Sequence, residues 1–87
     1  MLGVKIKDLK KDDVVWECAQ IGGSIKVRIM ETPNHEDGKW TFRGMTPGGI
    51  QNYLATDGYM HYGPKFYKEP IYFPIDEREP KEVEDEN

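Results

Sequence analysis

Cysteine and long apolar runs are both scarce in this chain of 87 residues. Its one cysteine, Cys18, excludes an internal disulfide and any metal site built from cysteines alone, which fits a reducing cytoplasm. No apolar run approaches the roughly 20 residues that span a bilayer. Residues 1–9 alternate apolar and charged side chains, unlike the continuous apolar core of a secretory signal. We therefore expect a cytoplasmic protein without a membrane contact.

The residue clusters that carry catalysis are also missing. Gly44–Gly49 contains glycines but lacks the lysine and the following helix of a phosphate-binding loop, so a turn explains it better. We find no nucleophile beside a base and no pair of carboxylates arranged for acid–base chemistry. His35 lies next to acidic residues on one predicted loop, without the further ligands that a tetrahedral metal site needs. The sequence therefore predicts a protein that is not an enzyme and that holds no metal or cofactor.

Charge is unevenly distributed along the chain. Residues 1–74 carry ten Lys and Arg against nine Asp and Glu, whereas residues 75–87 carry two against seven. A nearly neutral body lacks the basic face that binds duplex DNA. We predict one small β domain over residues 1–74 and an irregular acidic tail over residues 75–87. The tail is expected to be a solvating appendage, with nucleic-acid mimicry or a dock for a basic partner as the alternatives.

Short alternating apolar runs, separated by turn residues every eight to twelve positions, are typical of an all-β domain. The predicted strands are 14–20, 24–31, 39–43 and 50–56, with a short fifth strand at 59–62 and edge pieces within 65–73. Gly22–Gly23 gives the clearest hairpin signal, whereas Thr32–Gly38 has the composition of a loop. The fold class is therefore a single small antiparallel barrel or sandwich of about five to six strands.

The start of the first long strand carries a fold-level resemblance. Leu9, a charged turn through Asp12–Asp13 and then Val14–Val15 resemble the opening of SH3-like and KOW-type domains. In those domains a leucine, two or three polar residues, Gly-Asp and two valines lead into the strand, and Asp12 stands where the glycine usually is. The resemblance implies an SH3-like barrel and carries no activity with it.

Aromatic residues are concentrated in one stretch. Six of the ten lie between Asp57 and Phe73, more than a chain this short needs for its core. Gly63–Pro64 divides the stretch. The first part carries Tyr59, His61 and Tyr62, and we expect it to meet a partner. The second part carries Phe66, Tyr67, Tyr72 and Phe73, and we expect it to close the core.

The leading functional hypothesis is a non-catalytic binding module that acts through this aromatic face on a protein partner or in self-association. Small acidic single-domain proteins of this kind are common among phage and mobile-element accessory proteins. The alternative is a binder of a nucleotide, cyclic signalling nucleotides included, or of single-stranded nucleic acid, with bases between tyrosines and Lys or Arg on phosphate. The candidate binding residues are Tyr59, His61, Tyr62, Lys65, Phe66, Tyr67, Lys68 and Arg43.

Overall fold

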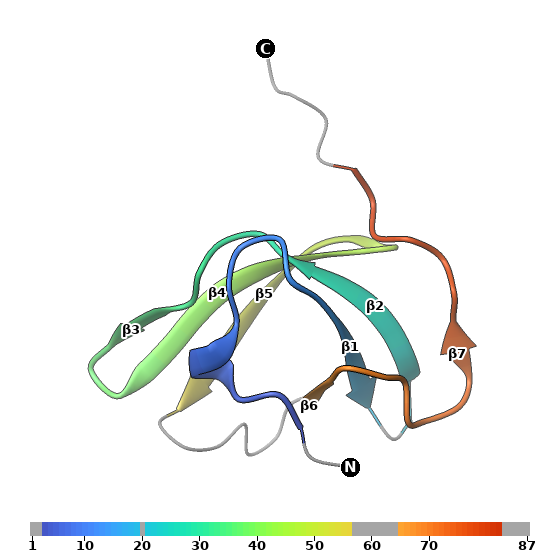
Figure 1. The fold of residues 1–87 in the computed structure, drawn as a ribbon, viewed down its shortest axis with the longest axis horizontal. Helices are drawn as coiled ribbons and strands as arrows, with labels where there is room; N and C mark the ends of the chain where they lie inside the picture. Colours follow the sequence, from blue (N-terminus) through green and yellow to red (C-terminus); the bar gives the residue numbers. More distant parts are fainter. Residues whose placement is uncertain (1–2, 20, 57–64, 83–87) are drawn as a thin grey trace.

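The computed structural model describes residues 3–19, 21–56 and 65–82, and within these ranges the chain is all-β (Figure 1). A 3₁₀ turn, η1 (Ile6–Asp8), precedes the strands. The strands are β1 (Val14–Ala19), β2 (Gly23–Ile29), β3 (Asn34–Glu36), β4 (Lys39–Thr46), β5 (Gly49–Thr56), β6 (Lys65–Tyr67) and β7 (Ile75–Asp76). The all-β prediction is confirmed. The strand count in these ranges exceeds the predicted five to six because the short β3 and β7 were not expected.

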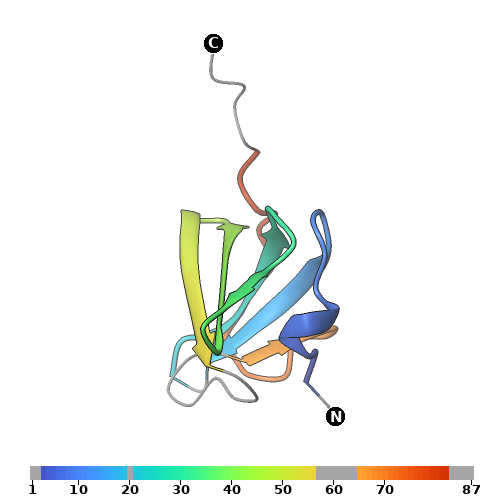
Figure 2. The ribbon, with the colours of Figure 1, turned by 90° about the vertical axis from the view of Figure 1, so that its left-hand side faces the viewer.

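The strands form one sheet in the order β3-β4-β2-β1-β6, with β5 paired to β4 and β7 paired to β2. All pairings are antiparallel except that of β7 with β2, which is parallel. The sheet is curved (Figures 1 and 2). Within the described ranges no ladder joins β5 to β6, so the hydrogen-bonded sheet is open between these two strands.

The turn before β1 explains the aspartate in the SH3-like pattern. Asp13 donates its backbone N–H to the carbonyl of Lys10 at 3.1 Å, and Asp12, the third residue of this turn, has φ of +73°. A positive φ at that position is the requirement that usually selects glycine. Asp12 meets it because a short polar side chain tolerates the left-handed region better than other non-glycine residues.

The segment predicted as a loop, Thr32–Gly38, contains β3 and is corrected accordingly. Asp37 and Gly38 form a two-residue turn with φ of +53° and +72°, the signs of a type I′ hairpin, and β3 pairs back on β4. From Ile29 to Asn34 the chain advances five residues, while the β4 side advances three, from Gly44 to Thr41. A bulge of two extra residues therefore separates β2 from β3. The bulge interrupts the alternation of apolar and polar residues, so the pattern does not predict β3.

The core lies on the inner face of the curved sheet and consists of Leu9, Val15, Val27, Ile29, Phe42, Tyr53 and Phe66. Three of its rings contact one another: Phe42 and Tyr53 stack with centroids 5.1 Å apart, and Phe66 meets Tyr53 edge-on at 5.1 Å. Gly44 permits this packing, because a Cβ there would lie 2.5 Å from Val27 Cγ1. The predicted inward face of β2, with Val27 and Ile29, is confirmed.

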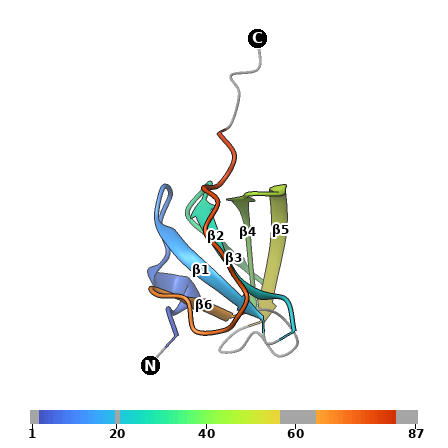
Figure 3. The same cartoon turned by 90° about the vertical axis from the view of Figure 1, so that its right-hand side faces the viewer.

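The start of the acidic tail is attached to the sheet. We call residues 72–81 the C-terminal strap; in Figure 3 the chain after β6 runs past β1 and β2. Ser24 binds the strap through two hydrogen bonds. Its N–H donates to the carbonyl of Pro74 at 2.9 Å, and its Oγ donates to the carbonyl of Tyr72 at 2.8 Å. Farther along, Lys26 Nζ lies 2.7 Å from Glu79 Oε1. The strap therefore follows β2 from its first residues toward the end of β4, where Lys81 N–H donates to the carbonyl of Thr46.

Candidate functional site

Only part of the predicted aromatic contact face lies within the residues that the structure describes. Tyr59, His61 and Tyr62 lie outside the described residues, and their contact role stays a prediction. Phe66 and Tyr67 lie in β6 and are buried, with exposed fractions of 1% and 8%. Their rings are occupied by packing within the domain, which takes both residues out of the predicted contact face and fits the expectation that the second part of the stretch closes the core.

The two remaining aromatics of that part lie on the strap. Tyr72 is half-buried, and its N–H donates to Ser24 Oγ at 3.1 Å. Phe73 is 81% exposed, so the expectation that it closes the core is wrong. The reason is local: the neighbours Tyr72 and Pro74 hold the backbone against Ser24, and the Phe73 side chain between them points outward.

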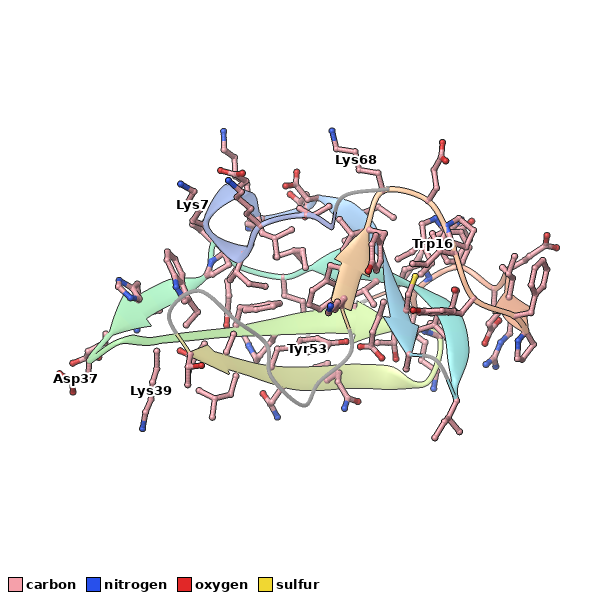
Figure 4. The ribbon with its side chains drawn as sticks, turned by 90° about the horizontal axis from the view of Figure 1, so that it is seen from below. Lys7, Trp16, Asp37, Lys39, Tyr53 and Lys68 are labelled. Atoms are coloured by element: carbon pink, nitrogen blue, oxygen red, sulfur yellow. The ribbon has the colours of Figure 1, made fainter. Side chains whose placement is uncertain are left out.

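The predicted cationic residues are not brought together. Arg43 lies on the outer face of β4 and holds Glu31 with two hydrogen bonds, of 2.8 and 3.0 Å, which lower the pKa of the Glu31 carboxyl. Lys65 is exposed on β6, which pairs with β1. Lys68 is exposed just after β6, and Figure 4 shows it, like Lys7, on the side opposite Lys39. Arg43 and these lysines therefore belong to different surfaces.

A hollow of about 960 Å³ lies between the N-terminal segment, β1 and the chain after β6. Its lining includes Val4, Leu9, Val14 and Val15, with Lys5 and Lys68 as the cations and Asp8, Asp13 and Glu69 as the anions. Three carboxylates against two ammonium groups do not favour a phosphate group. None of the rings predicted to stack on a base lines the hollow.

A carboxyl–phenol pair is partly enclosed at the inner face. Tyr53 donates its phenol O–H to Glu17 Oε1, and the pair links β5 to β1 across the interior. Burial raises the pKa of the Glu17 carboxyl, although the hydrogen bond from Tyr53 acts in the other direction. Burial, followed by the hydrogen bond to Glu17, raises the pKa of Tyr53 above its ordinary value of 10. Figure 4 shows Tyr53 directed into the space between the strands.

The outer surface of β5 is the most apolar exposed strand surface in the described part of the chain, and the prediction of site residues missed it. Ile50 is 52% exposed and Leu54 61% exposed, with the exposed Asn52 between them. On β4 the exposed Thr41 lies opposite Leu54 and the exposed Arg43 lies opposite Asn52, whereas Met45, opposite Ile50, is buried. We call Ile50, Asn52 and Leu54 the β5 outer triad.

The sequence does carry a signal for this surface. Residues 44–56 form the longest stretch without Asp, Glu, Lys or Arg, and β5 lies wholly inside it. The alternation within 50–56 separates the triad from Gln51, Tyr53 and Ala55, but apolar residues occur in both sets. Only the packing of Tyr53 and Ala55 into the interior shows that the triad faces outward.

Three further findings bear on function. Across residues 3–19, 21–56 and 65–82, no group of three or more His, Cys, Asp and Glu side chains is placed to hold a metal ion. The same ranges contain no helix with the length and apolar character needed to cross a membrane. Comparisons of the chain with protein-family models, with curated proteins and with solved structures gave no match.

Proposed function

We propose that this protein is a small non-catalytic binding module of the cytoplasm that makes a protein contact, with a partner or with itself, through the outer surface of β5. The observation that carries the proposal is the exposure of Ile50 and Leu54, at 52% and 61%, on an uncharged strand. Exposed apolar side chains grouped on one strand are typical of a protein contact. The single Cys18, which is buried, supports the cytoplasmic assignment.

This proposal moves the contact face from the aromatic stretch to the strand before it. Tyr59, His61 and Tyr62 follow β5 directly in the sequence and remain candidates for the edge of the same face. The nucleotide alternative needs a stacking ring beside an unengaged cation. It is weakened because Phe66 and Tyr67 are buried and Arg43 is bound to Glu31.

The experiment compares two substitutions that each place a lysine at an exposed aliphatic position. Leu54→Lys places an ammonium group in the β5 outer triad, whereas Val14→Lys places one on β1, where the native side chain is 52% exposed. Mass in solution by light scattering and capture of binding proteins are measured for the wild type and both variants. We expect Leu54→Lys to lose the contact at least about tenfold, because burying an unpaired charge is costly, and Val14→Lys to keep it. Equal behaviour of two folded variants would refute the proposed function.

A further inference from the structure

We propose that the partner of β5 is the β5 strand of a second copy, paired antiparallel about a two-fold axis at Asn52, so that two sheets join into one. The inference rests on the proposed function above, and it specifies the partner and the register. It follows from three properties of β5: an edge without a hydrogen-bonded neighbour in the described residues, the absence of protective features, and a side-chain pattern that matches itself when reversed.

The edge of β5 is the first property. All eight residues of β5 pair with β4 in one uninterrupted register, from Thr56 opposite Lys39 to Gly49 opposite Thr46. Of the strands in the described ranges, only β4 pairs with β5, so on its second edge the backbone N–H and C=O groups of residues 50–54 have no strand partner there. Figures 2 and 3 show β5 at one side of the molecule, with β4 on its inner side.

The second property is the lack of devices that normally prevent edge pairing. Proteins protect edge strands with charged side chains, prolines or bulges, or keep them very short. β5 contains no charged residue and no proline, its register with β4 has no bulge, and it is as long as β4, at eight residues. By contrast, β3, which pairs with the opposite edge of β4, has three residues and includes Glu36. Among the described residues, β5 is thus a long outer strand without these protective features.

The third property is self-complementarity. In an antiparallel pair about Asn52, Ile50 of each copy lies opposite Leu54 of the other, and the two Asn52 side chains lie opposite each other. The pairing thereby forms two equivalent aliphatic contacts, and an amide can both donate to and accept from a second amide. Because opposite residues share a face, the outer triads of both copies form one continuous outer surface, and Tyr53 stays on the inner face.

Other registers match less well. An axis one residue away, at Gln51 or Tyr53, places Asn52 opposite Ile50 or Leu54 and leaves one aliphatic side chain of each copy beside an amide. An axis between two residues places outer residues opposite inner ones, so that the apolar triad of one copy would face the core side of the other. In the Asn52 register the two Arg43 residues lie three strand spacings apart, about 14 Å, because each is opposite its own Asn52 on β4, and each is bound to Glu31.

Single-cysteine cross-linking tests the register. Opposite residues of an antiparallel pair have Cα atoms about 4.5–5.5 Å apart, within the range of a disulfide. Under mild oxidation Asn52→Cys should give a covalent dimer. Ile50→Cys and Leu54→Cys should each fail alone, because their equivalent atoms lie about 13 Å apart, and should cross-link when mixed. The native Cys18 is 3% exposed, so the wild type is the background control.

The outcomes separate this inference from the proposed function. A covalent Asn52→Cys dimer, with the pair of mixed variants also linked, supports both. Equal cross-linking of all three single variants, or preferred cross-linking of Ile50→Cys alone, overturns the register. A wild type that remains monomeric at every concentration, yet loses a captured protein on Leu54→Lys, overturns self-pairing and leaves the proposed function standing. A wild type whose contacts do not respond to Leu54→Lys overturns both.

Discussion

At the residue scale, the contact between Glu17 and Tyr53 is an interaction whose energy depends on pH. Glu17 lies on β1 with its side chain toward the interior, where water no longer solvates the carboxylate fully. A charged acid in such a place costs free energy unless it is hydrogen-bonded, and the Tyr53 phenol supplies that bond. The pair thus joins two strands that share no hydrogen-bonded ladder in the described residues.

We predict that Glu17→Gln flattens the pH dependence of stability. Burial raises the folded-state pKa of Glu17 above its ordinary value of 4.5, so the folded protein binds more protons than the unfolded chain above that pH. The Glu17 contribution to stability is therefore fully present below pH 4.5 and is lost as the pH rises through the folded pKa. Glutamine keeps an acceptor oxygen for Tyr53 and has no such loss.

Urea unfolding from pH 4 to pH 8 measures this effect. The free energy of unfolding of Glu17→Gln should fall less with rising pH than that of the wild type. Glu36→Gln is the matched control, since Glu36 is exposed on β3 and its replacement should preserve the wild-type slope. The same slope for all three proteins would contradict the role assigned to burial of Glu17.

At the scale of single elements, the turn from Lys10 to Asp13 sets the entry into β1. Its backbone is held by the bond between Asp13 N–H and the Lys10 carbonyl, and by Asp13 Oδ2, which accepts from Lys10 N–H at 2.9 Å. The same turn reaches β2, because Asp12 N–H donates to the carbonyl of Ile29 at 2.7 Å. The turn therefore fixes where the first hairpin begins.

We predict that Asp12→Gly stabilises the protein by about 0.5–1 kcal/mol, because glycine removes the strain of a left-handed backbone at φ of +73°. The gain is limited by the greater freedom of glycine in the unfolded chain. Asp13→Gly is the matched control and should destabilise, since it deletes the side-chain acceptor of Lys10 N–H. Thermal and urea unfolding measure the stability of both variants. A loss of stability in Asp12→Gly would contradict the backbone strain assigned to Asp12.

Much of the fold could be predicted from the sequence because the signals were local. The alternation of Val27 and Ile29 and the glycine hairpin before β2 locate the first two long strands to within two residues. β3 and β7 could not be found this way. β3 follows a bulge that breaks the alternation, and β7 depends on contacts with Ser24 and Ile25, about fifty residues earlier.

The candidate site was less predictable for a physical reason. Aromatic content indicates that large side chains are present, but it does not determine which of them the core takes. Phe66 and Tyr67 fill the core and the space beside β1, whereas Phe73, six residues later, is exposed. The β5 outer triad depends on which face of an evenly apolar strand turns inward, and this is decided by the packing of Tyr53 against Phe42.

At the scale of the whole molecule, the strap makes β2 the most enclosed strand among the described residues. β2 pairs with β1 on one edge and with β4 and β7 on the other, and Val27 and Ile29 have no exposed surface. Ser24 is also fully buried, and its hydroxyl holds both the N–H and the carbonyl of Tyr72. At Gly23 an added Cβ would lie 2.1 Å from the Pro74 carbonyl oxygen, so the strap sits directly on the start of β2.

We predict that Ser24→Ala releases the strap and lowers the free energy of unfolding by about 1–3 kcal/mol, because it leaves polar groups of Tyr72 without their partner. Glu79→Gln, which removes the surface ion pair with Lys26, should cost less than about 1 kcal/mol. Amide hydrogen exchange locates the effect. In Ser24→Ala the N–H of residue 24, bound to Pro74, should exchange faster, while the N–H of Met30, bound to Arg43, keeps its protection relative to global unfolding. Equal acceleration at both amides would instead show that the strap and the sheet open as one cooperative unit.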